Sequence, residues 1–384
     1  MKICAIICEY NPFHNGHLFQ LNTAKERSGA DAIVCIMSGS FTQRGESAIL
    51  DKYTRAKHAV LAGADAVIEL PTVFSTSNAE LFSKGAIHLL SSIPDVQILC
   101  FGAENADKLA FISAARYLQN EPKEVSDKIK KLTASGISYA KARAQAYAGF
   151  IPMDVLSSPN NILGLEYTRA ILEKNADIDV LPIQRVGGGY NDKNLQTEFS
   201  SATAIRQAII DKKGIENNLP PFVRKDLPKR IDTCLEDMEK YAVLSKSKEE
   251  IARICDCTEG LENAFKKAVL ENKPFTETLT CARYTSSRIR RIALQTLLSI
   301  EKDFIKDCLQ NQLYLRILAI KKERSNVLSA LSQSVFPLII RAHDENVLTG
   351  VAKSCFEKDV FAETLRNVLY NTTAQERNIF IESL

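Results

Sequence analysis

The feature that most restricts the fold is an apolar strand that runs directly into a His-x-Gly-His turn near the start of the chain. Residues 3–8 are apolar without alternation, which indicates a central parallel strand covered on both faces. An Asn-Pro pair ends the strand, and apolar residues return at helical spacing after Gly16. His14 and His17 are therefore expected where a strand gives way to a helix N-terminus, at which free N–H groups and the helix dipole attract anions.

This turn has the chemistry of a nucleotide site. His14 and His17 are three residues apart, so both imidazoles can project from the first helical turn toward one phosphate chain. There they can stabilise the charge that develops on a phosphate under attack. Gly16 allows a ligand to approach the backbone closely.

A metal site is the competing interpretation of two neighbouring histidines. The other three of the five histidines are His58, His88 and His343. No Cys-x-x-Cys or His-Glu-x-x-His spacing supplies further ligands. The sequence therefore favours the nucleotide site, and we assign no residue as a metal ligand.

Composition limits the class of protein. The chain has 384 residues, of which 45% are hydrophobic, enough for two or three domains with cores of their own. The ten cysteines are scattered and several lie in strand-like runs, which is typical of reduced, buried thiols. We find neither a signal-peptide pattern nor a membrane span, so we expect a cytoplasmic protein that does not bind membranes. The net charge of +3 is too small to imply a polyanionic partner by itself.

Strands and helices alternate through the first half of the chain. Further strands are predicted at residues 31–37, 66–70, 96–101 and 179–185, and helices at 52–62, 78–91, 106–148 and 160–174. This alternation predicts an α/β fold with a doubly wound parallel sheet of Rossmann type, whose ligands lie beyond the carboxyl ends of the strands. Such ends carry His14, His17, Ser38, Gly39 and Gly102.

Two later segments could complete the site. Ser201 and Thr203 precede a predicted helix that carries Arg206, and this is either a second anion site or an ordinary N-cap beside a surface arginine. The glycines at 187–189 form either a loop that closes over a ligand or a simple connection.

The chain changes character near residues 217–229, which are rich in Pro, Asn and charge and predict a linker. Beyond it we find no strand-like runs, and apolar residues at spacings of three and four predict an all-α region. We therefore expect a nucleotide-binding domain at 1–215 and a helical domain at 216–384. Basic residues gather at 281–324, either as an RNA-phosphate surface or as a solvated helix face. They include Arg283, Arg288, Arg290 and Arg291, and Tyr284 offers a stacking surface for an unpaired base.

Together these features resemble the His-x-Gly-His nucleotidyltransferase superfamily, which is related to class I aminoacyl-tRNA synthetases. Four strings, at residues 9–17, 37–46, 158–164 and 283–285, are similar to the bacterial tRNA(Met) cytidine acetate ligase family, and the similarity covers nearly the whole chain. The chain departs from that pattern at Ser40, Thr42 and Ser47, where Asn, Val and Pro would be usual. These are small changes in one loop.

The resemblance implies a reaction in two steps. Acetate and ATP, with Mg²⁺ carried in by the ATP, would give acetyladenylate and pyrophosphate. The acetyl group would then pass to N4 of the wobble cytidine of elongator tRNA(Met), without an obligatory protein partner. His14, His17 and Arg44 would act in catalysis, with Arg44 steering the acetate or a phosphate. The implied nucleotide contacts are Ile7, Asn11, Pro12, Phe13, Asn15, Gly16, Gly102, Asn160, Asn161, Arg185, Ser201 and Thr203.

Three other functions remain open. A small-molecule adenylyltransferase shares the first domain but leaves the helical domain without a purpose. An aminoacyl-tRNA synthetase would carry a Lys-Met-Ser-Lys-Ser-like loop, which is absent from this sequence. A non-catalytic RNA-binding protein has no need of the intact histidine turn.

Overall fold

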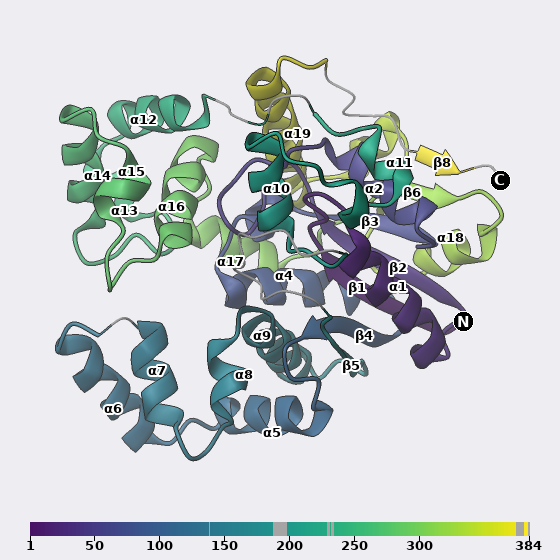
Figure 1. The fold of residues 1–384 in the computed structure, drawn as a ribbon, viewed down its shortest axis with the longest axis horizontal. Coiled ribbons are helices and arrows are strands. Elements are labelled where there is room, and N and C mark those ends of the chain that lie inside the picture. The colour runs from purple at the N-terminus through teal and green to yellow at the C-terminus, as the bar shows by residue number, and fades with distance from the viewer. Residues whose placement is uncertain (138, 187–197, 229–230, 232–233, 374–379, 383–384) are drawn as a thin grey trace.

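A single sheet organises the fold (Figure 1). The computed structural model describes residues 1–137, 139–186, 198–228, 231, 234–373 and 380–382. Within them the strand order is β5-β4-β1-β2-β3-β6-β7, and β8 pairs with β6. The first five strands are mutually parallel, which confirms the predicted doubly wound sheet. The strands are β1 (Ile3–Cys8), β2 (Ala32–Ser38), β3 (Ala66–Leu70), β4 (Val96–Ala103), β5 (Asp179–Gln184), β6 (Leu315–Lys321), β7 (Leu338–Ile339) and β8 (Phe380–Glu382).

Both faces of the sheet are covered by helices, as the continuous apolar strands predict. Alternate residues of each strand enter different cores: Ile3 and Ile7 belong to one cluster, and Cys4 and Ile6 to the other. The first face is covered by α3 (Thr72–Ser75), α4 (Ala79–Leu90), α5 (Lys108–Gln119), α9 (Pro159–Lys174), α17 (Lys302–Gln310), α18 (Ser325–Leu331) and α19 (Gly350–Tyr370). The second is covered by α1 (Asn15–Ser28), α2 (Lys52–Leu61), α10 (Ala202–Ile210) and α11 (Pro221–Arg224).

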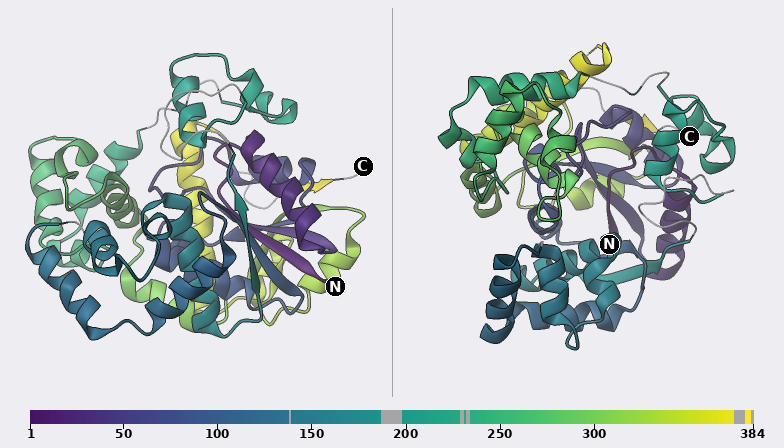
Figure 2. Two further views of the ribbon diagram at one scale, coloured as in Figure 1. Left: turned by 60° about the horizontal axis from the view of Figure 1, so that its bottom comes forward. Right: turned by 60° about the vertical axis from the view of Figure 1, so that its left-hand side comes forward.

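Two groups of helices extend away from the sheet (Figure 2). One comprises α6 (Lys123–Ala134), α7 (Tyr139–Tyr147) and α8 (Met153–Ser157). The other comprises α12 (Leu235–Ser245), α13 (Lys248–Ala252), α14 (Leu261–Leu270), α15 (Phe275–Leu279) and α16 (Ser286–Leu298). This second group has a small hydrophobic core of its own. None of the helices in the described ranges has the length and apolar character that crossing a bilayer requires.

The second half of the chain is largely helical, as expected, but the expectation that it contains no strand is wrong. After α12–α16 the chain returns to the sheet as β6, which lies antiparallel to β3. Leu313, Ile317 and Leu318 are among the apolar residues at spacings of three and four that predict an all-α region. A short apolar run fits a buried strand equally well, and here the sheet edge decides between the two. The boundary at residue 215 stays a prediction.

Buried charges hold β6 against β3, the neighbouring strand from the first half of the chain. The ammonium of Lys52 lies 2.9 Å from a Glu69 carboxylate oxygen, and both side chains are fully buried. The guanidinium of Arg316 on β6 lies 3.3 Å from the other oxygen of Glu69. Because removing either cation would leave a buried carboxylate without one partner, the cluster ties β6 to β3 and α2.

Close packing of α9 on β4 depends on Gly164. A Cβ atom at this position would lie 2.4 Å from Cε2 of Phe101. We expect Gly164→Ala to lower the free energy of unfolding by about 1–3 kcal/mol, as over-packing does, measured by urea denaturation. Gln119→Ala, at the exposed end of α5, serves as the control and should change it by no more than about 0.5 kcal/mol. Equal stability of Gly164→Ala and the wild type would contradict this account of the packing.

Candidate active site

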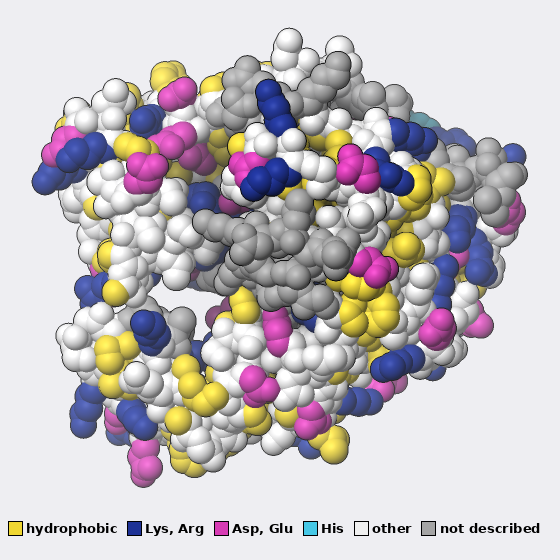
Figure 3. Space-filling model, in the orientation of Figure 1, with side chains coloured by type: hydrophobic (Ala, Val, Ile, Leu, Met, Phe, Trp, Pro, Cys, Tyr) yellow, Lys and Arg dark blue, Asp and Glu magenta, His cyan; other side chains and the backbone are white. Residues whose placement is uncertain are grey.

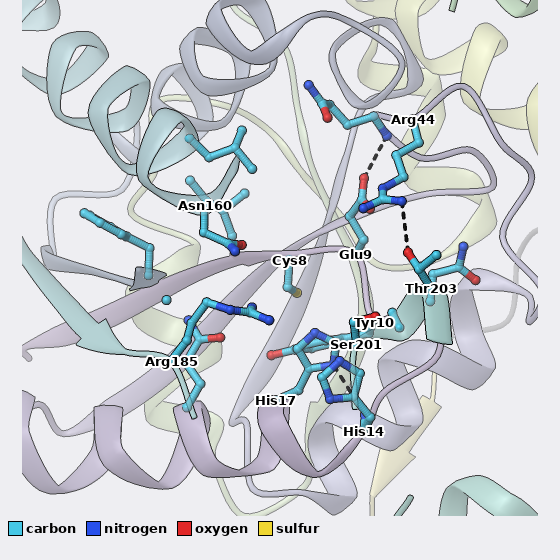
Figure 4. A pocket seen from close by; sticks show the side chains of 18 of the residues that line it. Cys8, Glu9, Tyr10, His14, His17, Arg44, Asn160, Arg185, Ser201 and Thr203 are labelled. Carbon is cyan, nitrogen blue, oxygen red and sulfur yellow. Dashed lines mark hydrogen bonds between the residues drawn. The ribbon is translucent and has the colours of Figure 1, made fainter. Parts of the chain in front are cut away.

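A cleft opens beyond the carboxyl ends of β1, β4 and β5, where a doubly wound sheet is expected to bind ligands (Figure 4). It encloses about 990 Å³ of space, part of which is open to solvent. The turn after β1, the loop after β2, the end of β5 and the first turns of α9 and α10 line it. Segments far apart in the sequence therefore meet at one site.

The two histidines begin α1 and cap it reciprocally. His14 is the N-cap, and its Nδ1 accepts a hydrogen bond from the N–H of Gly16 over 3.1 Å. The N–H of His14 in turn donates to Nδ1 of His17 over 3.3 Å. The imidazoles stack with their centroids 3.7 Å apart. This arrangement fixes both rings at the helix N-terminus.

The capping bonds also determine which nitrogen of each neutral ring carries the proton. A neutral imidazole that accepts at Nδ1 carries its proton on Nε2. Burial lowers the pKa of His14 to about 3, with further lowering by Arg185 and Arg206. Burial and the neighbouring His14 hold the pKa of His17 well below its ordinary value. Both rings are therefore neutral near pH 7, and each keeps an Nε2–H donor that its capping bond does not use.

Gly16 has a structural role that the sequence did not suggest. A Cβ atom there would lie 2.9 Å from Cε1 of His14. The absence of a side chain thus makes room for the His14 ring to fold back over the first turn. Gly16 itself lines an adjoining pocket that shares His14 and His17 with the cleft.

Three arginines make the cleft strongly cationic. Arg185 follows β5 and extends toward the histidines, while Arg44 enters from the opposite side (Figure 4). Nη1 of Arg44 donates to the hydroxyl of Thr203 over 2.9 Å. Arg206 donates to the carbonyl of Asn11 over 2.8 Å and pairs with Glu46 at 3.2 Å. This charge suits a polyphosphate ligand.

The structure distinguishes the two adjacent asparagines. Asn160 lines the cleft and donates to Glu104 over 2.6 Å. Asn161 is fully buried, and its Oδ1 accepts from the N–H of Glu104 over 2.8 Å. Asn161 therefore holds the loop after β4, while Asn160 faces the ligand space. Gly102, on β4, also lines the cleft.

The remaining predicted nucleotide contacts also divide into residues that line the cleft and residues that support its walls. Ile7, Asn11, Ser201 and Thr203 line the cleft, and Ser201 is also the N-cap of α10, accepting from the N–H of Ala204 over 3.1 Å. Residues 12, 13 and 15 do not line the cleft and instead support the turn that carries the histidines. Pro12 and Phe13 are buried, and the amide of Asn15 donates to the carbonyl of Asn217 over 2.8 Å. The glycines at 187–189 lie outside the described residues.

Sequence reasoning missed the apolar wall of the cleft. Phe82, Phe101, Leu163 and Tyr167, on α4, β4 and α9, are among the residues that line it. The three aromatic residues are buried and Leu163 is half-buried, so together they give this part of the cleft an apolar character that suits a nucleobase. Their positions come from packing between distant elements, and only the helical spacing of residues 163 and 167 hinted that they share a face. The carboxyl of Glu9, whose pKa burial raises, also lines the cleft.

Two of the basic residues of the second half, Arg290 and Arg291, lie in the N-terminal half of α16, against the loop that carries Arg44. Arg290 donates to the carbonyl of Arg44 over 3.2 Å and pairs with Glu46 at 3.4 Å. Arg291 is buried and pairs with Asp256 at 3.2 Å. A Cβ at Gly45 would lie 2.6 Å from the backbone nitrogen of Arg291. The loop and the helix are thus in direct contact.

The N-terminal end of this basic segment is more accessible. Arg283 is exposed and pairs with Glu259 at 3.4 Å. The guanidinium of Arg288 lies 5.0 Å from the Tyr284 ring centroid and donates to the carbonyl of Asp256 over 2.9 Å. On the face drawn in Figure 3, Lys and Arg are interspersed with Asp and Glu. An RNA-binding role for these residues stays a prediction.

Comparison with known proteins adds independent information. The family model described as HIGH Nucleotidyl Transferase matches residues 1–379. A tRNA(Met) cytidine acetate ligase of Thermoanaerobacter sp. (strain X514) is 35% identical over 100% of this chain and 99% of its own length. The enzyme of that name from Thermosipho africanus is 34% identical over 98% of this chain and 97% of its own.

Solved structures are also similar over the full length. Apo Thermotoga maritima TmcAL matches with a TM-score of 0.92 and 27% identity, covering 100% of both chains. The same protein bound with alpha-thio ATP matches with a TM-score of 0.87, again over 100% of both chains.

The neutral state of His14 predicts how stability depends on pH. The unfolded chain takes up a proton near the ordinary value of 6.5, whereas folded His14 does so only near pH 3. Stability from this residue is therefore complete above pH 6.5 and is lost as the pH falls, by about 1.4 kcal/mol per unit. On going from about pH 7.5 to about pH 5, the wild type should lose about 2 kcal/mol more than His14→Asn, measured by urea denaturation. Equal losses in the two proteins would mean that His14 is not held neutral.

Proposed function

The chain belongs to the HIGH nucleotidyl transferase family and, within it, to the tRNA(Met) cytidine acetate ligases, and from this premise we propose that it acetylates the wobble cytidine of elongator tRNA(Met). Acetate would be activated by ATP, and the acetyl group would pass to N4 of the base. The observation that carries the proposal is the pair of neutral imidazoles at the start of α1, in a cleft that three arginines make cationic.

In the first step, an acetate oxygen attacks the α-phosphorus of ATP. The bond from that phosphorus to the oxygen bridging to the β-phosphorus breaks, and pyrophosphate leaves with the electron pair. The Nε2–H groups of His14 and His17 would donate to the phosphate oxygens on which charge develops. Arg185 and Arg206 supply fixed positive charge at the same place. The rings need no rearrangement during the reaction because the helix caps already orient them.

The nucleotide and acetate are assigned to opposite parts of the cleft. The adenine would lie against the apolar wall of Phe101, Leu163 and Tyr167, with Asn160 at its edge. Arg44 is the residue we assign to the acetate carboxylate or a phosphate, because its guanidinium lies in the cleft beside Thr203.

Mg²⁺ would accompany the phosphates of ATP. Glu9 is the one carboxylate among the described residues that line the cleft, and Mg²⁺ typically combines one or two carboxylates with substrate phosphates and water. When bound, the ion would supply charge neutralisation to the leaving pyrophosphate.

In the second step, the N4 amino group attacks the carbonyl carbon of acetyladenylate. AMP leaves, and N4 loses a proton to become an amide. Residues 216–384 would present the tRNA, with Arg283 and Tyr284 as the accessible contacts to its phosphates and bases. Since ATP and tRNA are cytoplasmic substrates, we assign the enzyme to the cytoplasm.

The acyl donor tests the function directly. The purified chain supplied with ATP, acetate, Mg²⁺ and elongator tRNA(Met) should produce N4-acetylcytidine, measured by nucleoside analysis after digestion. Acetyl-CoA without ATP should not replace acetate and ATP. Transfer from acetyl-CoA alone would overturn the mechanism, and acetate-dependent ATP cleavage without acetylated tRNA would favour a small-molecule adenylyltransferase.

The histidines can be tested in the first step alone. His17→Ala removes a donor to the phosphates and should slow acetate-dependent pyrophosphate release by a factor on the order of 10². His343→Ala is the matched control, because that side chain is 70% exposed and lies outside the cleft. Unchanged pyrophosphate release by a folded His17→Ala protein would refute the assignment of the site.

A further inference from the structure

One group of helices carries the excess positive charge of the chain. Helices α6–α8 span residues 123–157, which hold six basic residues and three acidic ones. This excess equals the net charge of +3 of the whole chain. Between residues 128 and 153 there are five basic residues and no acidic one. The rest of the chain is therefore balanced in charge, and this group is the part of the protein that most attracts a polyanion.

The lysines of α6 are accessible to a partner. Val125 and Ile129 are buried, so one side of this helix packs against the protein. Lys128, Lys130 and Lys131 are exposed, and none of the three forms an ion pair within the described part of the chain. One side of α6 thus serves the fold, while the rest of its surface presents cations to solvent.

The group formed by α12–α16, to which the sequence analysis assigned the RNA contacts, has a different charge balance. Residues 235–298 hold eleven basic residues and ten acidic ones. Three of the arginines are paired with acidic residues of the protein itself, namely Arg283, Arg290 and Arg291. An RNA bound to this group alone would have to displace those carboxylates before its phosphates could reach the arginines.

The catalytic cleft lies between the attachment points of these two groups. α8 leads directly into α9, whose residues Asn160 and Leu163 line the cleft. The guanidinium of Arg143 on α7 lies 3.0 Å from the carboxylate of Glu166 on α9, which fixes the first group to this wall. The loop with Arg44 forms another wall and contacts α16 of the second group. Figure 3 shows an open gap between the two groups of helices.

We propose that the exposed face of α6 binds phosphates of the tRNA, and that the anticodon arm is held between the two groups of helices. Both strands of that arm carry phosphates, so an arm whose loop enters the cleft presents negative charge to both groups. Lysine ammonium groups bind phosphates as point charges and read no base, so this face supplies affinity and orientation. The inference rests on the proposed function and adds a second RNA contact surface to it.

Removal of two charges from α6 tests the inference. The double variant Lys128→Gln with Lys131→Gln should raise the Kd for elongator tRNA(Met) about tenfold at about 0.1 M salt, measured by fluorescence anisotropy. The plot of log Kd against log salt should become less steep by about two, because each phosphate contact contributes about 0.9 to the slope. In acetylation, KM for the tRNA should rise while kcat stays within about twofold. Acetate-dependent pyrophosphate release without tRNA should be unchanged.

A matched variant separates the α6 face from the net charge of the protein. Lys25→Gln with Arg27→Gln removes the same charge from exposed positions on α1. This helix lies on the opposite side of the molecule from α6 (Figure 1). The α1 variant should bind tRNA within about twofold of the wild type. Since all four positions are exposed, both variants should keep the thermal midpoint of the wild type.

The outcomes distinguish the two levels of proposal. If the wild type acetylates no RNA under any condition, the proposed function itself fails. If it does, but the α6 variant keeps the wild-type Kd and salt dependence, or the α1 variant weakens binding equally, only the α6 surface is overturned. A lysine-rich face can also bind anionic lipid. Loss of binding to phosphatidylglycerol vesicles by the α6 variant, with tRNA binding unchanged, would assign the face to a membrane and overturn the inference.

Discussion

The reciprocal capping of α1 by His14 and His17 is the interaction on which the site depends. Each ring uses Nδ1 to satisfy a backbone N–H that the helix leaves unpaired. The same bonds determine the tautomer, the ring orientation and the stacking. Structure and chemistry are therefore not separable here, because the groups that begin the helix are also the proposed donors to the phosphate. Gly16 belongs to this unit, since a side chain at that position would displace the His14 ring.

The second constraint is the return of the chain to its own sheet. Glu69, at the end of β3, is held by Lys52 from α2 and by Arg316 from β6. A Cβ atom at Gly39 would lie 2.3 Å from the carboxylate of Glu69, so this buried cluster also supports the start of the loop that carries Arg44. The last helix contributes as well, because the guanidinium of Arg366 donates to the carbonyls of Ala48 and Ile49. The C-terminal region thus supports the loop between β2 and α2 at both ends.

Local patterns predicted much of this architecture. The strands at 3–8 and 66–70 were expected at those exact bounds, because continuous apolar runs ended by turn residues have few other structures. His14, His17 and Gly102 were expected near one another, because parallel strands end at a common edge, and all three line the cleft. Arg44 and Arg185 were expected there only from the resemblance to the family. The pairing of β6 with β3 and the roles of Asn160 and Asn161 were not predictable, since each depends on contacts between segments far apart in sequence. For the same reason, the sequence did not predict the apolar wall of the cleft or the orientation of Arg290 and Arg291.

The contact between Gly45 and α16 has a thermodynamic consequence. Because the backbone of the loop touches the backbone of the helix, an RNA that displaces α16 also displaces the segment that carries Arg44. Coupling between two binding sites is reciprocal: the factor by which one ligand changes the affinity for the other applies equally in reverse. Any influence of bound tRNA on the affinity for ATP or acetate would therefore be matched by an equal influence of those small molecules on the affinity for tRNA. The fraction of the enzyme that holds tRNA would then respond to the cellular supply of ATP and acetate.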